Sequence, residues 1–372
     1  MTEESPKNAA SQDSQRDAAR ASKPGFFRRL QNFSDDYLPQ GRLLPILAGA
    51  LILYGIVVLV VGMLWSIAPS AFDVRENARR FVASQDAAGS LAEPVVGATT
   101  TAALMGVVDT LLSKPGGFLS NDRFPPGVYL DNIPNWEYGA LIQSRDLARA
   151  MREFFSRSQS QSKEDPDLAL AEPRLNFQSD SWLLPASETK YREAVRYTEG
   201  YLRRLTDPAA SDAQFYARAD NLREWLAMVN TRLGSLSQRL SASVGQRRVN
   251  TDLAGDDSAS QSTAAPGELE IRTPWTEIDD VFYESRGAAW ALIHFLKAAE
   301  VDFADVLRNK NAQVSLRQII RELEATQAFV WSPMILNGTG FGMLANHSLV
   351  MASYISRANA GIIDLRDLLS RG

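Results

Sequence analysis

Cysteine is absent from the 372 residues, and only two histidines occur. The chain therefore has no disulfide framework, no thiolate zinc site and no cysteine nucleophile, and two imidazoles are too few for most histidine-rich metal centres. Basic side chains are not in excess either, because 39 Lys and Arg stand against 44 Asp and Glu. This balance lacks the basic character of a nucleic-acid-binding protein, so we expect no nucleic-acid partner, no metal and no cofactor.

One long stretch of the chain carries no charge at all, from residue 43 to residue 68. As a helix it would measure about 39 Å, which exceeds the hydrocarbon thickness of about 30 Å. A cleavable signal peptide has a shorter apolar region and a shorter lead than the 42 residues found here. We predict an uncleaved transmembrane anchor at 43–68, with a phospholipid bilayer as its partner. Small residues at Ala48, Gly55 and Gly62 repeat at seven-residue spacing, which suits self-association.

The segment before the anchor, 1–42, is predicted to be a cytoplasmic tail. Its first 23 residues are polar and small and cannot bury enough surface to fold. Residues 26–37 then place apolar side chains at helical spacing beside Arg28 and Arg29, as in a basic amphipathic helix on an anionic leaflet. Basic residues near the anchor are slightly more numerous on this side. We therefore place 69–372 in the periplasm of a Gram-negative cell, attached to the inner membrane.

Beyond the anchor the apolar periodicity is helical, and no run of alternating strands is seen. The predicted fold class is all-α: one transmembrane helix followed by an elongated helical bundle. Helices are expected at 98–112, 135–157, from Ser187, from a capping box at Thr276 and Asp279, at 314–330 and at 346–370. The helix after Thr276 is apolar on two faces, which predicts a position inside the bundle.

The clearest periodic signal is a heptad seam between Phe215 and Leu240, with apolar residues spaced alternately by four and three. It predicts a long helical hairpin or coiled coil, closed within one chain or between two. The polar segment at about 246–269 lacks any pattern and is predicted to be a mobile linker that interrupts the periplasmic domain.

Several stretches resemble one family of proteobacterial proteins. They include KPGGFLSNDRFPPGVYLDNIPNWEYG at 114–139, FYARADNLREWL at 215–226 and WSPMILNGTGFGMLANHSLVMASYISRANAGIIDLRDLL at 331–369. The family is catalogued as domain of unknown function 2333. The resemblance covers the chain from the anchor to the C-terminus. It implies a single-pass inner-membrane protein and carries over no catalytic residue.

Three polar clusters are candidate ligand sites, and each has a structural alternative. The first, Asp131, Trp136 and Glu137, suits either a helix cap or a sugar-binding loop. The second, a polar stretch at 156–180 that includes Arg174, suits either a solvated loop or binding of a polar polymer.

The third cluster is the glycine-rich loop at 337–342 with Asn337, Asn346 and His347, which suits either a tight turn or an anion site. Further along, Glu284 and Asp280 lie four residues apart beside Arg286. Such a spacing fits a carboxylate pair for glycoside cleavage, or a solvated helix face.

These observations favour an interaction or scaffolding module of the cell envelope, with a protein partner or self-association and without catalysis. The alternative is an envelope hydrolase or glycan-binding protein, which requires a cleft that joins Glu137, Asp280 or Glu284 to Trp136 or Trp331. A further alternative is a lipid-binding bundle with a cavity lined by Phe282, Trp290 and Phe295.

Overall fold

The structure is a computed structural model that describes residues 43–83, 95–158, 162–210, 212–249, 268–332, 334–339 and 342–371. The predicted tail, with its basic amphipathic segment, and most of the predicted linker lie outside these residues. The chain divides into two compact units, Met1–Leu59 and Val60–Gly372.

The first long helix is α2 (Leu43–Trp65). Its segment Pro45–Trp65 is long and apolar enough to cross a membrane. Most of its apolar side chains are exposed, as expected of a helix whose surroundings are lipid rather than protein. The helix ends at Trp65, so residues 66–68 of the predicted anchor lie beyond it.

The unit Val60–Gly372 is predominantly helical. Its described helices are α3 (Val74–Ala83), α4 (Ala98–Ser113), α5 (Asn132–Ala150), α6 (Pro166–Leu175), α7 (Ser187–Thr206), α8 (Ala219–Ser241), α9 (Ile278–Asp302), α10 (Ala304–Asn309), α11 (Gln313–Ala325) and α12 (His347–Ser370). Short helical turns lie at Gly127–Tyr129 (η1), Met151–Phe155 (η2, of π type), Ala242–Val244 (η3) and Trp275–Glu277 (η4).

One small sheet departs from the predicted all-α class. Strands β1 (Gln246–Val249) and β2 (Glu268–Ile271) pair antiparallel, with Gln246 opposite Ile271. These strands occupy both ends of the segment predicted as a linker at 246–269, so that prediction is corrected there. The paired ends carry β-branched and aliphatic residues, which favour a strand once a partner strand is present.

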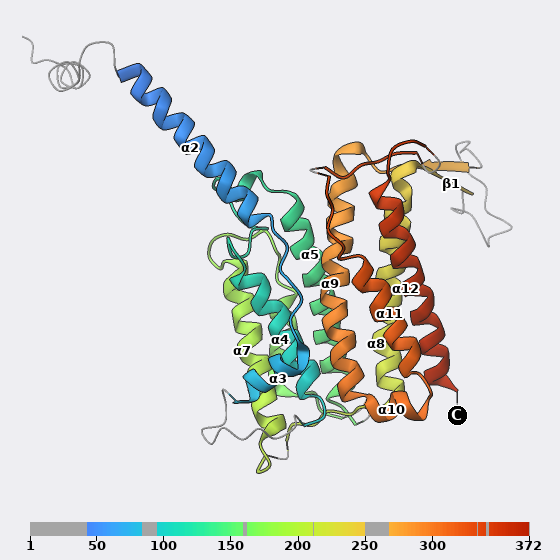
Figure 1. Ribbon diagram of the computed structural model, residues 1–372. Coiled ribbons are helices and arrows are strands. Elements are labelled where there is room, and N and C mark those ends of the chain that lie inside the picture. Colours follow the sequence, from blue (N-terminus) through green and yellow to red (C-terminus); the bar gives the residue numbers. More distant parts are fainter. Residues whose placement is uncertain are drawn as a thin grey trace, which may run out of the picture. The chain divides into compact units, whose positions relative to one another are not determined.

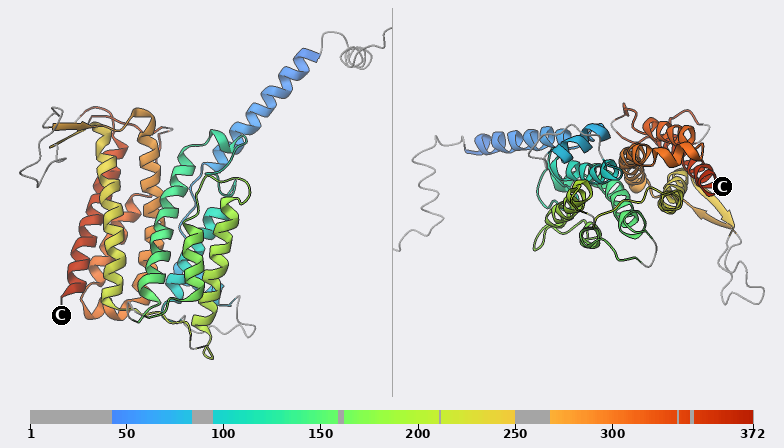
Figure 2. Two further views of the ribbon diagram at one scale, coloured as in Figure 1. Left: turned by 180° about the vertical axis from the view of Figure 1, so that it is seen from behind. Right: turned by 90° about the horizontal axis from the view of Figure 1, so that it is seen from below.

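The long helices of this unit alternate in direction (Figure 1). The ends of α4, α8 and α11 lie beside the starts of α5, α7, α9 and α12, and the view from behind in Figure 2 shows the same arrangement. Because β1 and β2 also lie there, we call this the sheet end of the body. Helix α10, which connects α9 to α11, lies at the opposite end of the body.

Helix α9 lies in the middle of the core, as predicted from its two apolar faces. It contacts α4, α5, α11 and α12. Its contact with α5 depends on two glycines: an added Cβ on Gly287 would lie 1.9 Å from the backbone oxygen of Trp136, and one on Gly139 would lie 2.0 Å from that of Glu284. Only glycine permits such close approach of two backbones.

The heptad residues of α8 are buried from Leu222 to Leu240. The helix packs chiefly along α12 and only weakly against α9, the next long helix in the chain. Its apolar stripe is therefore covered within the chain by a helix distant in sequence. This arrangement differs from a hairpin of two consecutive helices.

Several helix starts differ from the sequence prediction. Asp131, not Asn135, is the N-cap of α5, and its carboxylate accepts a hydrogen bond from the backbone N–H of Asn132. The capping box predicted at Thr276 does not form, because η4 precedes α9 and no side chain caps that helix. The sequence predicts a loop where the structure has helix α6. Asp165 caps this helix, and Pro166 occupies its first position, where a backbone N–H would have no partner within the helix.

His294 fastens the chain segment that follows α2 to the core. Its Nε2 accepts a hydrogen bond from the backbone N–H of Phe72 at 3.1 Å, so Nδ1 carries the proton and donates to the backbone oxygen of Trp290 at 2.7 Å. The ring stacks on Phe72 at 4.0 Å between centroids. Burial lowers the pKa of His294 to about 4, so the ring is neutral at neutral pH. This histidine is therefore a structural residue of the core.

Candidate functional site

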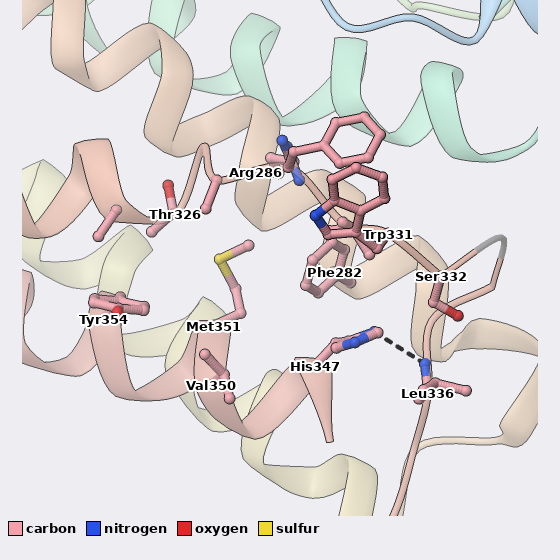
Figure 3. A pocket seen from close by; sticks show the side chains of 14 residues that line it. Phe282, Arg286, Thr326, Trp331, Ser332, Leu336, His347, Val350, Met351 and Tyr354 are labelled. Atoms are coloured by element: carbon pink, nitrogen blue, oxygen red, sulfur yellow. Dashed lines mark hydrogen bonds between the residues drawn. The ribbon is translucent and has the colours of Figure 1, made fainter. Parts of the chain in front are cut away.

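An apolar groove opens at the sheet end between α9, α11 and α12 (Figure 3). Its volume of about 470 Å³ falls within the range of about 300–1,000 Å³ that is usual for binding sites. We call it the α9–α12 groove. Its lining comprises Phe282, Arg286, Ala325, Thr326, Ala328, Phe329, Val330, Trp331, Ser332, Leu336, His347, Val350, Met351 and Tyr354.

The rim of the α9–α12 groove carries two exposed aromatic side chains. Phe329 is 74% exposed and Trp331 is 90% exposed, and their rings meet edge to face at 5.1 Å. Between them Val330 packs against the core and holds the segment in place. Two adjacent aromatic rings left in water cost hydrophobic free energy that a bound apolar surface would recover.

Arg286 supplies the positive charge of the α9–α12 groove. Its Nη2 donates to the backbone oxygen of Gln327 at 2.9 Å, and the Gln327 amide donates back to the Arg286 backbone oxygen at 3.0 Å. Among the described residues, no carboxylate lies within 4.0 Å of its guanidinium. Burial lowers the pKa of Arg286 from its ordinary value, while Tyr283 acts against this. The group nevertheless stays charged, since arginine does not deprotonate in proteins.

His347 connects the floor of the groove to the start of α12. Its Nδ1 accepts a hydrogen bond from the backbone N–H of Leu336 at 3.1 Å, drawn as a dashed line in Figure 3. Its own backbone N–H donates to the Leu336 oxygen at 3.0 Å. With Nδ1 used as an acceptor, the neutral ring carries its proton on Nε2.

The chain was compared with known proteins. Residues 40–372 match the model of a family described as "Uncharacterized protein conserved in bacteria (DUF2333)". The chain belongs to this family. No curated protein and no solved structure matches it. For this member of the domain of unknown function 2333 family, the roles of individual side chains therefore rest on its own geometry.

Asn337 and Asn346 are the chain neighbours of the groove residues Leu336 and His347, and they bond to each other. The Asn346 amide donates to Oδ1 of Asn337 at 2.9 Å, and its own Oδ1 accepts from the Leu349 N–H as the N-cap of α12. Asn337 also donates to the Ser243 oxygen. The polar atoms of this loop are used for its own folding. These hydrogen bonds favour the interpretation of the glycine-rich segment as a tight turn. Its residues 340 and 341 lie outside the described residues.

Two residues of the first sequence cluster, Trp136 and Glu137, are built into the core, whereas Asp131 is the exposed N-cap of α5. Glu137 is fully buried, forms an ion pair with Lys114 Nζ at 2.6 Å, and accepts hydrogen bonds from the Leu119 and Ser120 backbone N–H groups. Burial raises the pKa of Glu137, whereas Lys114 and the donors oppose this rise. Trp136 is also fully buried, with its ring 5.0 Å from that of Trp290. A ring in that position is not available to stack on a sugar.

The remaining candidates Glu284 and Arg174 form ion pairs, and neither lines the α9–α12 groove. Glu284 is held by both Nη atoms of Arg239, at 2.8 and 2.6 Å, and its neighbour Asp280 accepts instead from the side-chain amide of Asn135. Arg174 donates to Glu193 at 3.0 Å and lies over the ring of Tyr197. Asp280 and Glu284 thus have separate partners.

A second cavity of about 390 Å³ between α5, α8 and α9 contains Glu284 together with Arg232, Arg239 and Gln143. Glu284 contributes the one carboxylate among the residues that line it. Glycoside cleavage uses two carboxyl groups across one cleft. The described residues around Glu284 do not supply that pair.

Of the predicted site residues, the structure brings Arg286 and His347 into one groove and places Asn337 and Asn346 beside it. Sequence analysis missed Phe329 and considered Trp331 only as a sugar platform. The available signal was the run Phe329-Val330-Trp331, three consecutive apolar residues in the connection after α11, where polar residues are the rule.

Proposed function

We propose that this protein is a membrane-anchored interaction protein that binds an apolar segment of a partner protein in the α9–α12 groove. The helix α2 is the proposed anchor. The proposal rests on two features that occur together in the groove. The rings of Phe329 and Trp331 are exposed, and the half-buried guanidinium of Arg286 forms no ion pair with a carboxylate of the described residues.

The composition of the groove matches that of protein–protein interfaces. Aromatic residues and arginine dominate the binding energy of such interfaces, especially at the centre of a desolvated patch. An Arg286 guanidinium that already lies in an apolar surrounding favours a partner segment with one acidic side chain or a carboxyl terminus. An amphipathic helix that presents apolar residues and one carboxylate has the required chemistry.

The two alternatives from the sequence have less support. The lipid alternative required an interior cavity at Phe282, Trp290 and Phe295, but the latter two lie in the packed core and line none of the cavities described above. The glycan alternative required an accessible Trp136 beside paired carboxylates. The α9–α12 groove is open at the surface and apolar, which favours a protein segment.

The experiment is photo-crosslinking in cells with a benzoylphenylalanine at Phe329. Val314 is a matched control, because it is 75% exposed and lies near the start of α11, whose other end leads to Phe329. We expect a discrete protein adduct at position 329 that is absent at 314. In an Arg286→Gln background the yield of this adduct should fall several-fold.

Three results would contradict the proposal. Equal adducts at both positions would indicate random collision, and lipid adducts without protein would favour the lipid alternative. An adduct whose yield does not change with Arg286→Gln would show that the cation does not recognise the partner.

The proposal includes the membrane topology expected from the charges, with 69–372 in the periplasm of a Gram-negative cell. Because the chain has no cysteine, a Val314→Cys variant carries a single thiol. A membrane-impermeant maleimide should label it in cells whose outer membrane alone is permeabilised. Labelling only after lysis would reverse the topology.

A further inference from the structure

Two loops at the sheet end expose a continuous set of large apolar side chains. The first, before and within η1, exposes Phe124, Val128 and Tyr129; the second, before α7, exposes Trp182, Leu183 and Leu184. Leu184 is 88% exposed. The rings of Phe124 and Trp182 meet edge to face at 6.3 Å, so the two loops form one surface. We call these residues the interfacial loops.

The interfacial loops lie beside the last turn of α2. An added Cβ on Gly62 would lie 3.5 Å from Cβ of Pro126 and 3.6 Å from Cδ2 of Leu130, and one on Gly116 would lie 2.7 Å from the ring of Trp65. These residues all belong to the unit Val60–Gly372. Gly62 precedes the end of the apolar span at Trp65 by three residues, which is about 4.5 Å along the helix axis. Pro126 and Leu130 are therefore at the level where the span ends.

The interfacial loops are held in place by hydrogen bonds between them. The side-chain amide of Asn121 donates to the Ser181 oxygen and to Glu188, both at 2.8 Å, and Arg123 donates to the Asp180 oxygen at 3.2 Å. The Ser187 hydroxyl donates to the Ser181 oxygen at 3.0 Å. The apolar side chains are thus carried on a fixed support, and their exposure does not result from a frayed chain end.

We infer that the interfacial loops insert their apolar side chains into the headgroup region of the bilayer, as a second membrane contact in addition to α2. This inference rests on the proposed role of α2 as an anchor. Tryptophan and tyrosine favour the membrane interface because their rings are apolar with a polar edge. Asp122 and Asp180 accompany Arg123, so the surface has no positive excess and burial of apolar area drives the contact.

The test uses single-cysteine variants of the full chain, spin-labelled and reconstituted into phosphatidylcholine vesicles. Labels replace Leu183 and Val128 in the interfacial loops, Val57 in α2 and Val314 near the start of α11. Collision with oxygen, which partitions into lipid, is compared with collision with a water-soluble nickel chelate. We expect Leu183 and Val128 to collide with nickel several-fold less often than Val314 and with oxygen more often.

The Val57 label separates this inference from the proposed anchor. If Val57 is protected and the loop labels collide with nickel as often as Val314, the anchor stands and the inference is overturned. If Val57 is itself open to nickel, the anchor fails and the inference fails with it. Protection of the loops only in vesicles that contain anionic lipid would contradict the apolar mechanism inferred for the contact.

Discussion

Two cations near the sheet end have opposite surroundings. Lys114 is buried, bonds to the Gly117 backbone oxygen and pairs with the fully buried Glu137. Arg286 is half-buried and bonds to the backbone oxygen of Gln327, without a carboxylate among the described residues. The comparison shows that Glu137, which the sequence suggested as a ligand-binding residue, is fully paired inside the core. Arg286, whose charge has no carboxylate partner among the described residues, lies instead in the apolar groove.

The largest effect is expected for Lys114→Met. The substitution leaves the Glu137 carboxylate buried without its cation, which costs about 3–5 kcal/mol of unfolding free energy. Urea denaturation in detergent micelles at neutral pH measures it. Because the variant also loses the charge that opposes the raised pKa of Glu137, the loss should shrink as the pH is lowered and the carboxyl takes up a proton.

The control for this prediction is Lys114→Met combined with Glu137→Gln. The neutral amide removes the unpaired charge, so the double variant should be more stable than Lys114→Met alone. A double variant that is as unstable as the sum of both single changes would show that the pair is not a unit, and the contrast with Arg286 would lose its basis.

The second effect concerns His294, whose Nε2 can accept the hydrogen bond from the Phe72 N–H only when the ring is neutral. Its folded pKa of about 4 lies below its unfolded value of 6.5. The unfolded chain therefore takes up a proton first as the pH falls. The stabilisation is complete above pH 6.5 and is lost progressively down to about pH 4, by about 3 kcal/mol in total.

The measurement for His294 compares the wild type with His294→Gln in urea unfolding between pH 7 and pH 4. Other titrating groups are common to both proteins, so the difference between the two curves isolates the histidine. The wild type should lose more stability than the variant over this interval. Parallel curves would mean that folding does not lower the pKa of His294.

Sequence patterns predicted the parts of this fold that depend on long apolar periodicity. The span in α2 and the buried stripe of α8 follow from spacing alone. Helix α7 starts at Ser187 as predicted, although Ala186 and not Ser187 is its N-cap, and α12 starts one residue after the predicted residue 346. Helix α3 was missed because it buries only Val74 and Ala78, too few residues for a pattern. Helix α6 was missed because it contains prolines at its start and in its interior, and prolines in a sequence usually indicate a loop.

The α9–α12 groove could not be predicted in the same way. Arg286 on α9, Phe329 after α11 and His347 on α12 come from three elements, and only tertiary packing brings them together. Likewise, Glu137 finds its partners in a loop without regular structure. These partners are Lys114 and the backbone N–H groups of residues 119 and 120, which precede Glu137 by 17 to 23 residues. No local spacing rule reports whether a given charge finds such a partner.

A third prediction contrasts Arg286→Gln directly with Lys114→Met. Arg286 makes one hydrogen bond to a backbone oxygen, and the net value of such a bond is about 1 kcal/mol. We expect an unfolding free energy within about 1 kcal/mol of the wild type, together with the fall in photo-adduct yield at position 329. A destabilisation as large as that of Lys114→Met would show that Arg286 is a structural cation, and the contrast between the two would be wrong.

The smallest effect on stability is expected for Trp331→Ala, and it separates folding from binding most clearly. Trp331 is almost fully exposed and its ring contacts that of the exposed Phe329, so its removal should change the unfolding free energy by no more than about 0.5 kcal/mol. If the bound partner covers Trp331, by contrast, truncation of this tryptophan should cost about 2 kcal/mol or more of binding free energy, so the adduct at position 329 should be largely lost. Loss of the adduct without loss of stability would identify Trp331 as a binding residue. An unchanged adduct would leave the exposed ring without a role in the α9–α12 groove and would move the partner's contact toward Arg286 and Met351.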